Sequence, residues 1–335
     1  MVAKPPSDET SEPPARRRVT SADVARAAGV SRATVSYVLN DVPGKTISEE
    51  TRELVLKTAS RLGHIPYAPA RSLRLGRSDI VLVLVRDFSF GYIASSLLHA
   101  LDAALARRGF IILVDRYDSA LRSVSELWQL VSPALVVAMG GLSGGPPVPE
   151  QSTIELSSER FLSLQGTVPN VEVGEMQAAY LAERGHTLIG YALPSSPTSE
   201  VIATERLHGT RRKCAQLGLP EPDVRVVDPE RPESVRDALD AWLARPGLTA
   251  VAAHSDDIAL MICSWLSSRG LTPGADLAVI GVDDIPAARI ELTTIGIDVK
   301  RWAAQVVAAV EALLDDGPPP RISTDIVRLI VRKTA

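Results

Sequence analysis

The sequence has few of the residues that cysteine-rich and metal-dependent proteins need. It contains 2 cysteines and 5 histidines among 335 residues. Cys214 and Cys263 are too few for a disulfide framework or a zinc site, and each lies in a helical pattern, so we expect buried, reduced thiols. The histidines show no spacing typical of metal ligands; they are His64, His99, His186, His208 and His254. We therefore predict neither a metal site nor a cofactor.

The sequence also lacks long apolar runs and the short motifs of common enzyme classes. No apolar segment follows Met1 and no uninterrupted run is long enough to cross a membrane, so we expect a cytoplasmic protein without membrane contact. No nucleophile elbow, Walker loop, zinc-protease motif or dinucleotide-binding glycine motif is present. Four carboxylates resemble a magnesium site, but helix capping explains their placement at lower cost; they are Asp256, Asp257, Asp283 and Asp284. We predict that the protein is not an enzyme.

Charge is distributed unequally along the chain, whose formal net charge is −4. Residues 1–78 carry 13 Lys and Arg against 8 Asp and Glu, a net +5, and the remainder carries 23 against 32, a net −9. Residues 1–17 are rich in Pro, Ser and acidic groups, and we expect a disordered tail. The basic part suits a partner covered in phosphates, whereas the acidic remainder would be repelled by one.

Residues 19–40 read as two short helices joined by a tight turn. Thr20 is placed to cap the first helix with Asp23 as the acidic partner of a capping box, and Gly29 supplies the turn. Ser31 is placed to cap the second helix, in which Val35, Val38 and Leu39 face inward. This is the pattern of a helix-turn-helix, which enters the DNA major groove; the alternative is an ordinary helical hairpin. The candidate DNA contacts are Thr20, Ser31, Arg32, Ala33, Thr34, Ser36, Tyr37 and Asn40.

The sequence of this segment resembles the signature of the lactose-repressor (LacI/GalR) family; it reads D-V-A-x-x-A-G-V-S-x-x-T-V-S-x-x-L-N. The resemblance continues through a third helix and a hinge, and it returns in ERLHG, HSDDIAL, AVIGVDDIP and LTTI. It implies that hinge helices of a dimer pair on the operator, with Leu73 wedged into the minor groove between the cations Arg71 and Arg74. A plain linker is the alternative. The hinge departs from the family at His64, Tyr67 and Pro69.

From Asp79 onward apolar strands alternate with amphipathic helices, which predicts parallel sheets covered on both faces. Expected strands are 80–85, 110–114, 134–138, 187–192, 224–227, 249–253 and 277–282, and expected helices are 92–108, 121–130, 200–217, 232–244 and 256–269. Two α/β lobes follow, and the resemblance implies that they form a periplasmic-binding-protein-like clamp. The predicted fold is therefore an α-helical helix-turn-helix headpiece plus a two-lobed α/β domain. We expect a tail at 1–17, the headpiece at 18–65, a hinge at 66–78, and an effector-binding and dimerisation domain at 79–335.

Polar and aromatic side chains follow several strands, where ligands of such sheets bind. The resemblance makes Arg206 and Asp283 ligand contacts, while helix capping by Asp256 and an ion pair of Arg206 with Glu205 or Glu200 are competing interpretations. Ser255 replaces a usual Asn, and an expected Asp-Asn pair is reduced to Pro169 and Asn170. The candidate effector contacts are Asp87, Phe90, Tyr92, Arg206, Ser255 and Asp283.

Taken together, these features predict a DNA-binding transcriptional regulator, a repressor that binds a near-palindromic operator as a homodimer. Its affinity would respond to a small-molecule effector, a sugar or related metabolite. Two alternatives remain at this stage. One is a small-molecule-binding α/β protein or hydrolase with an accessory headpiece. The other is a regulator of the same family whose cleft has lost polar ligand-binding residues and no longer responds to an effector.

Overall fold

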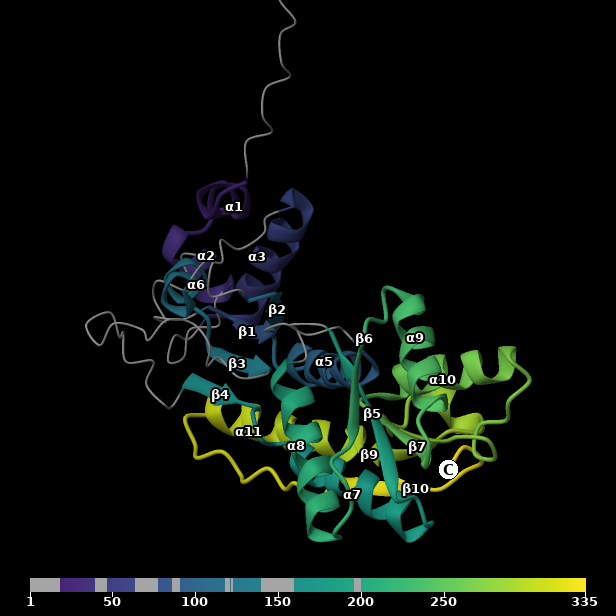
Figure 1. Cartoon of the computed structure of the whole chain (residues 1–335). Helices are drawn as coiled ribbons and strands as arrows, with labels where there is room; N and C mark the ends of the chain where they lie inside the picture. The colour runs from purple at the N-terminus through teal and green to yellow at the C-terminus, as the bar shows by residue number, and fades with distance from the viewer. Residues whose placement is uncertain are drawn as a thin grey trace, which may run out of the picture. The chain divides into compact units, whose positions relative to one another are not determined.

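The computed structural model describes residues 19–39, 47–63, 78–85, 91–117, 121, 123–139, 160–195 and 200–335. Contacts divide the chain into two compact units, Met1–Leu75 and Gly76–Ala335 (Figure 1). In the first unit, α1 (Ser21–Ala28), α2 (Arg32–Leu39) and α3 (Glu49–Leu62) enclose a small core. The second unit consists of two α/β lobes. This combination confirms the predicted fold class.

The headpiece helices begin and end where the local chemistry requires. The Thr20 hydroxyl accepts from the Asp23 backbone N–H at 3.4 Å, and the Asp23 carboxylate accepts from the Thr20 N–H at 2.9 Å, which completes the predicted capping box. Gly29 ends α1 with a φ of 67°, a conformation that favours glycine. Val24, Val35 and Val55 then meet in the core contributed by all three helices.

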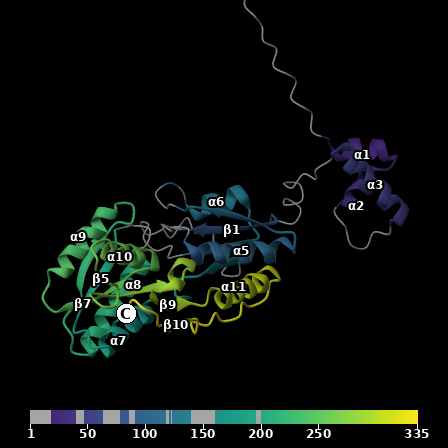
Figure 2. The ribbon, with the colours of Figure 1, turned by 90° about the vertical axis from the view of Figure 1, so that its right-hand side faces the viewer.

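The N-lobe has a parallel sheet in the order β2-β1-β3-β4. Its strands are β1 (Ile80–Val85), β2 (Ile111–Asp115), β3 (Leu135–Met139) and β4 (Phe161–Ser163). One face is covered by α6 (Val124–Val131), and the other by α5 (Tyr92–Ala106) and α11 (Val299–Leu314), which lie side by side (Figure 2). The β1 side chains are almost wholly buried between these layers, which gives the lobe its core.

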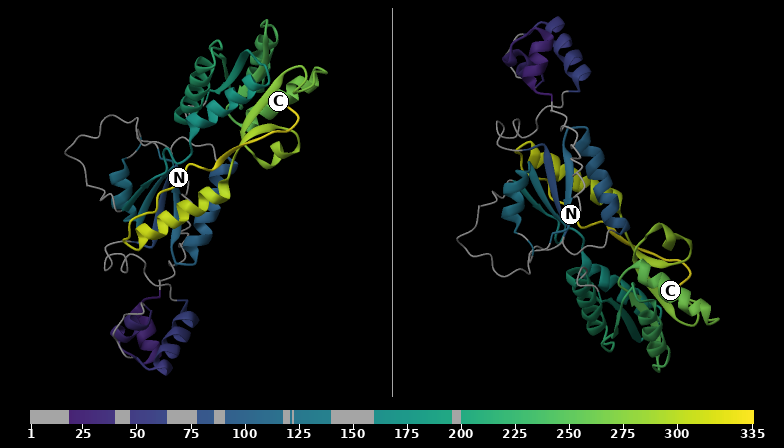
Figure 3. Two further views of the ribbon diagram at one scale, coloured as in Figure 1. Left: turned by 90° about the horizontal axis from the view of Figure 1, so that it is seen from below. Right: turned by 90° about the horizontal axis from the view of Figure 1, so that it is seen from above.

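The C-lobe has a larger sheet in the order β10-β9-β8-β7-β5-β6. Its strands are β5 (Leu188–Pro194), β6 (Asp223–Val227), β7 (Leu248–Ala253), β8 (Ala278–Asp283), β9 (Thr293–Ile297) and β10 (Val327–Ile330). On one face pack α7 (Asn170–Glu183) and α8 (Glu200–Gln216), and on the other α9 (Pro232–Leu243) and α10 (Asp256–Ser268), with the short helix η3 (Pro286–Ile290) following β8. The chain passes between the lobes three times, before α7, before α11 and before β10 (Figure 3).

The structure corrects several details of the sequence interpretation. β2 is an edge strand whose Ile111 and Leu113 are 66% and 42% exposed, so the expectation of full coverage is wrong there. β4, β9, β10 and α11 were not predicted, and β10 runs antiparallel to β9. α6 begins at Val124 rather than Leu121 because Ser123 and Glu126 form a capping box. Cys214 is buried as expected, whereas Cys263 is only partly buried.

Candidate functional site

The first candidate site is the outer surface of α2 in the headpiece. Arg32 and Ala33 are exposed, and Thr34, Ser36 and Tyr37 are partly buried. The Ser31 hydroxyl accepts from the Thr34 N–H at 2.9 Å and is hydrogen bonded to the Thr34 hydroxyl at 2.8 Å, so it caps the start of α2 as expected. Val35 and Val38 anchor the opposite side of the helix in the core, so the polar side is held outward on a rigid element.

Several predicted contacts of both candidate sites lie outside the described residues. In the headpiece and hinge these are Asn40, Arg71, Leu73 and Arg74, and in the clamp they are Asp87 and Phe90. Thr20 is exposed and is engaged in the capping box. The described part of the headpiece therefore contributes only residues of α2, its N-cap Ser31, and Thr20, the N-cap of α1, to the proposed interface.

The second candidate site is a cleft of about 380 Å³ between the two lobes. The N-lobe side includes Tyr92, Met139 and Trp302, and the C-lobe side comes from α7, α8 and the carboxyl ends of β5, β7 and β8. This volume suits a small metabolite. Apolar side chains form much of the wall: Ile93, Met139, Leu164, Val168, Val201, Ile202, Ile258, Ile285 and Ile297. Such a wall suits a ligand that carries an apolar face as well as polar groups.

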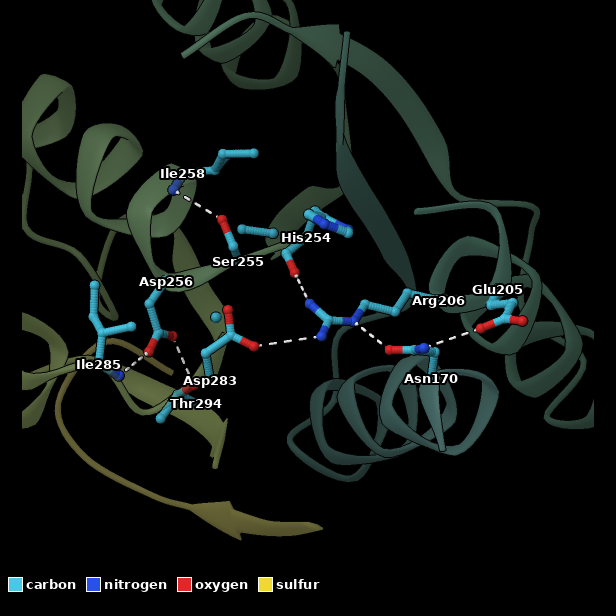
Figure 4. Close-up of polar contacts among 12 residues, drawn as sticks. Asn170, Glu205, Arg206, His254, Ser255, Asp256, Ile258, Asp283, Ile285 and Thr294 are labelled. Carbon is cyan, nitrogen blue, oxygen red and sulfur yellow. Dashed lines mark hydrogen bonds and ion pairs between the residues drawn. The ribbon is translucent and has the colours of Figure 1, made fainter. Parts of the chain in front are cut away.

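Arg206 lies at the centre of a polar network on the C-lobe wall (Figure 4). Its Nε donates to Asn170 Oδ1 at 3.1 Å, Nη1 to the His254 carbonyl at 2.6 Å, and Nη2 to Asp283 Oδ1 at 3.3 Å. Arg206 is only 5% exposed. It therefore pairs with Asp283 at the end of strand β8, and the interpretation of an ion pair with Glu205 on its own helix is wrong.

Asp283 is held in an unusual position for this contact. It ends β8 with a φ of 113°, and the following Asp284 has a φ of 55°, both in the region that disfavours side chains other than glycine. Burial raises the pKa of Asp283 to about 6, an effect that the neighbouring Arg206 opposes. Asp284 is anchored separately by Arg332, whose Nη2 donates to its Oδ1 at 2.7 Å. The carboxylate of Asp283 therefore faces Arg206, and that of the next residue, Asp284, faces Arg332.

Asp256 does not cap a helix, contrary to the sequence interpretation. Ser255 is the N-cap of α10, and its hydroxyl accepts from the Ile258 N–H at 3.5 Å. The fully buried Asp256 accepts instead from the Thr294 hydroxyl at 2.7 Å and from the Ile285 N–H at 2.9 Å. Burial raises the pKa of Asp256 to about 7, and the nearby Asp283 adds to this effect. Its carboxyl group therefore ties β9 and η3 to the start of α10 behind the cleft.

Ser255 and Tyr92, two of the predicted effector contacts, line the cleft and also contact other parts of the protein. Ser255 lines the cleft while it caps α10. Tyr92 lines the N-lobe side, and its hydroxyl accepts from Arg289 Nη2 at 3.4 Å, with the guanidinium 5.8 Å from the ring centre. Tyr92 and Arg289 thus make a contact between α5 of the N-lobe and η3 of the C-lobe.

Four polar or aromatic residues that were not among the predicted effector contacts also line the cleft: Asn170, Glu205, His254 and Trp302. Asn170 joins Arg206 to Glu205, because its Nδ2 donates to Glu205 Oε2 at 3.0 Å. The position of Asn170 at the first residue of α7 was the available signal. Burial lowers the pKa of His254 well below its usual value, so its ring is neutral at physiological pH. Trp302 had no comparable signal, because it reaches the cleft from the late helix α11.

A headpiece that exposes one helix, followed in the same chain by a two-lobed clamp with a metabolite-sized cleft, defines a DNA-binding regulator built on a ligand-binding domain. Comparisons with known proteins agree with this class. Residues 20–67 match the family described as bacterial regulatory proteins, lacI family, and residues 178–335 match a periplasmic binding protein-like domain. The chain belongs to the lacI family and is a transcriptional regulator.

Similarity to characterised relatives extends over most of the chain. It is 30% identical to the HTH-type transcriptional regulator GalS of Salmonella typhimurium over 83% of this chain and 84% of the relative. It is 28% identical to GalR of Escherichia coli over 94% of each chain, and 26% identical to the repressor PurR of Pasteurella multocida over 94% and 98%. The lac repressor dimer bound to operator and an anti-inducer has the same fold, with a TM-score of 0.71 at 23% identity over 95% and 99% of the chains.

Proposed function

We propose that this regulator is a repressor that binds a near-palindromic DNA operator as a homodimer, with an affinity set by a small-molecule effector in the cleft. The observation that carries the proposal is α2, whose polar side is exposed while Val35 and Val38 fix its opposite side in the core. Such a helix fits the major groove, and the net positive charge of residues 1–78 supplies phosphate attraction. The relatives include repressors such as PurR, which supports repression of transcription rather than activation.

Within the headpiece we assign base recognition to Arg32 and Tyr37, and phosphate contacts to Ser31, Thr34 and Ser36. Thr20, Ala33 and Asn40 complete the proposed interface at the ends and middle of the motif. In the hinge we propose, from the sequence, that Leu73 inserts into the DNA minor groove, with the cations Arg71 and Arg74 on either side of it in the sequence. Domain limits at residues 17, 65 and 78 are part of the same proposal.

The dimer proposal draws support from the apolar edge of the N-lobe. Ile111, Leu113 and Val114 of β2 are 66%, 42% and 38% exposed, and Leu130 of α6 is 79% exposed. Exposed apolar side chains of this size on an edge strand are typical of a surface that another chain covers. A second copy, related by two-fold symmetry, would bury the same residues from both chains and match two operator half-sites.

In the clamp we propose that the effector binds Arg206 and Asp283, with Ser255, Tyr92, Asp87 and Phe90 around it. Arg206 offers donors and Asp283 offers an acceptor on one wall, so hydroxyl groups of a ligand can bind both. Because a ligand shifts an equilibrium only through unequal affinity for two states, we expect it to favour one separation of the lobes.

The competing reading, a hydrolase or other enzyme with an accessory headpiece, has less support. The relatives are transcriptional regulators, and contacts with Arg206, Arg332 and Thr294 account for the carboxylates of Asp283, Asp284 and Asp256. We therefore propose a protein without catalytic activity, without a cofactor, and located in the cytoplasm with the nucleoid. In the described part of the chain, no helix is long and apolar enough to cross a membrane.

Selection of bound fragments from random duplex DNA by the full chain tests this proposal. The expected result is enrichment of one sequence with two inverted half-sites, because each headpiece of a dimer reads one half. A pool that shows no enriched sequence, under conditions where the protein still binds DNA in low salt, would overturn it.

A further inference from the structure

The charge of the cleft indicates what kind of effector it accepts. Its only cation among the described lining residues is Arg206, against three carboxylates, Glu205, Asp257 and Asp283. His254 adds no positive charge because burial keeps its ring neutral. The described wall therefore carries an excess of negative charge.

Arg206 is a poor site for an anionic ligand. Each of its three nitrogens already donates, to Asn170, to the His254 carbonyl and to Asp283, and the side chain is only 5% exposed. Asp283 balances its charge at 3.3 Å. An anion bound to Arg206 would lie close to the Asp283 carboxylate, which would repel it.

Glu205, by contrast, is a carboxylate without a cation. No ion pair of Glu205 is present in the described part of the structure, and its single hydrogen bond is the one from Asn170 Nδ2 at 3.0 Å. It lies inside α8, beyond the first turn, so helix capping does not explain it. The Arg206–Asn170–Glu205 chain of hydrogen bonds fixes the carboxylate in the wall while leaving its second oxygen, Oε1, without a hydrogen bond in the described structure.

We propose, on the basis of the proposed effector role of this cleft, that the effector is a small organic cation whose protonated amine binds Glu205. Asp257, which is exposed at the start of α10 on the same cleft, adds to the attraction. The apolar side chains and Trp302 contact the body of the molecule. A charge-assisted hydrogen bond between an ammonium group and a half-buried carboxylate is among the stronger polar contacts available in such a site.

Isothermal titration of the full chain with two matched sets of compounds tests this inference. One set is glucosamine, glucose and glucuronate, and the other is tyramine, tyrosol and 4-hydroxyphenylacetate. In at least one set we expect the amine to bind about tenfold more tightly than its neutral counterpart, and the acid not to bind. Equal or tighter binding of a neutral or acidic compound, or no binding of either amine, would overturn the inference.

Two variants separate the role of Glu205 from general effects on folding. Glu205→Gln keeps an acceptor for Asn170 and removes the charge, so the advantage of the amine over its neutral counterpart should fall about tenfold while the unfolding temperature stays unchanged. Glu183→Gln removes the same charge from an exposed position on α7 and should leave the advantage intact. An amine preference that survives Glu205→Gln would also overturn the inference. Operator selection by the same protein is independent of this result, so its success with failed amine binding would reject the cation inference alone.

Discussion

At the scale of single residues, Arg32 is the sharpest test of the proposed DNA interface. It is exposed on the first turn of α2, where an arginine reaches a base edge in the major groove. Arg32→Ala should weaken binding to the selected operator by roughly 1 to 3 kcal/mol and relax the preference at one base pair in each half-site. Fluorescence anisotropy on operators that differ at single positions measures both effects. Equal weakening on every sequence would reassign Arg32 to a phosphate contact.

Asp256 predicts a pH dependence of clamp stability. Burial raises its pKa to about 7, whereas an unfolded Asp titrates near 4. Between these values the folded clamp retains the proton and the unfolded chain releases it, so this stabilisation is greatest near pH 4 and is lost as pH rises to 7.

The variant Asp256→Asn cannot titrate and should be insensitive to this effect. Relative to the variant, the free energy of unfolding of the wild-type clamp should rise by roughly 2 to 4 kcal/mol between pH 7.5 and 4.5. Urea unfolding followed by tryptophan fluorescence at several pH values measures the difference. Parallel pH profiles for the two proteins would contradict the titration of a buried Asp256.

The sequence indicated part of this site and not the rest, for physical reasons. Arg206 and Asp283 were found because the motifs ERLHG and VDD resemble those of a known family. The contact of Arg206 with Asn170, and those of Asp256 with Thr294 and Ile285, join residues that are distant in the sequence. They form only when α7, α8 and α10 pack on the sheet of the C-lobe. Local patterns do not encode such contacts.

At the scale of elements, glycines set the distance between the helices that carry the site. A Cβ on Gly209 of α8 would lie 1.9 Å from the Val171 carbonyl oxygen, and a Cβ on Gly174 of α7 would lie 1.9 Å from that of Arg206. The two helices therefore pack backbone against backbone, which places Asn170 within reach of Arg206. The glycine of the ERLHG motif thus has a packing role.

Gly209→Ala should force α7 and α8 apart. We expect a loss of clamp stability of roughly 1 to 3 kcal/mol, as for other overpacked sites, together with weaker effector binding. Thermal unfolding of the variant measures the first effect, with Thr204→Ala at an exposed position of α8 as the control. A variant as stable as the wild type would show that the helices can separate at little cost.

Strand and helix positions were predictable to a larger extent than contacts between them. Except at the start of α6, the ends of the expected elements are correct within two residues, because apolar runs and caps are local signals. The exposed outer side of β2 was missed, since an edge strand and a central strand have the same apolar composition. Whether a strand lies at the edge or in the centre depends on how the strands are ordered in the folded sheet, and the composition of the strand itself does not show this.

At the scale of the whole molecule, the exposed edge of β2 predicts the assembly. Ile111→Asp would place charge in an interface shared by two chains, so it should shift the protein from dimer to monomer and weaken operator binding. Sedimentation equilibrium measures the mass. Leu217→Asp, at a position 50% exposed after α8, is the control and should remain dimeric. A dimer that persists in Ile111→Asp would place the interface elsewhere.

The most direct test of the central claim is a sedimentation velocity titration of the full chain with its selected operator and with a scrambled duplex of equal length. The account predicts a complex of two chains per operator, formed at least about a thousandfold more tightly than the complex with the scrambled duplex. One chain per duplex, or the same affinity for both sequences, would contradict a dimeric, sequence-specific regulator.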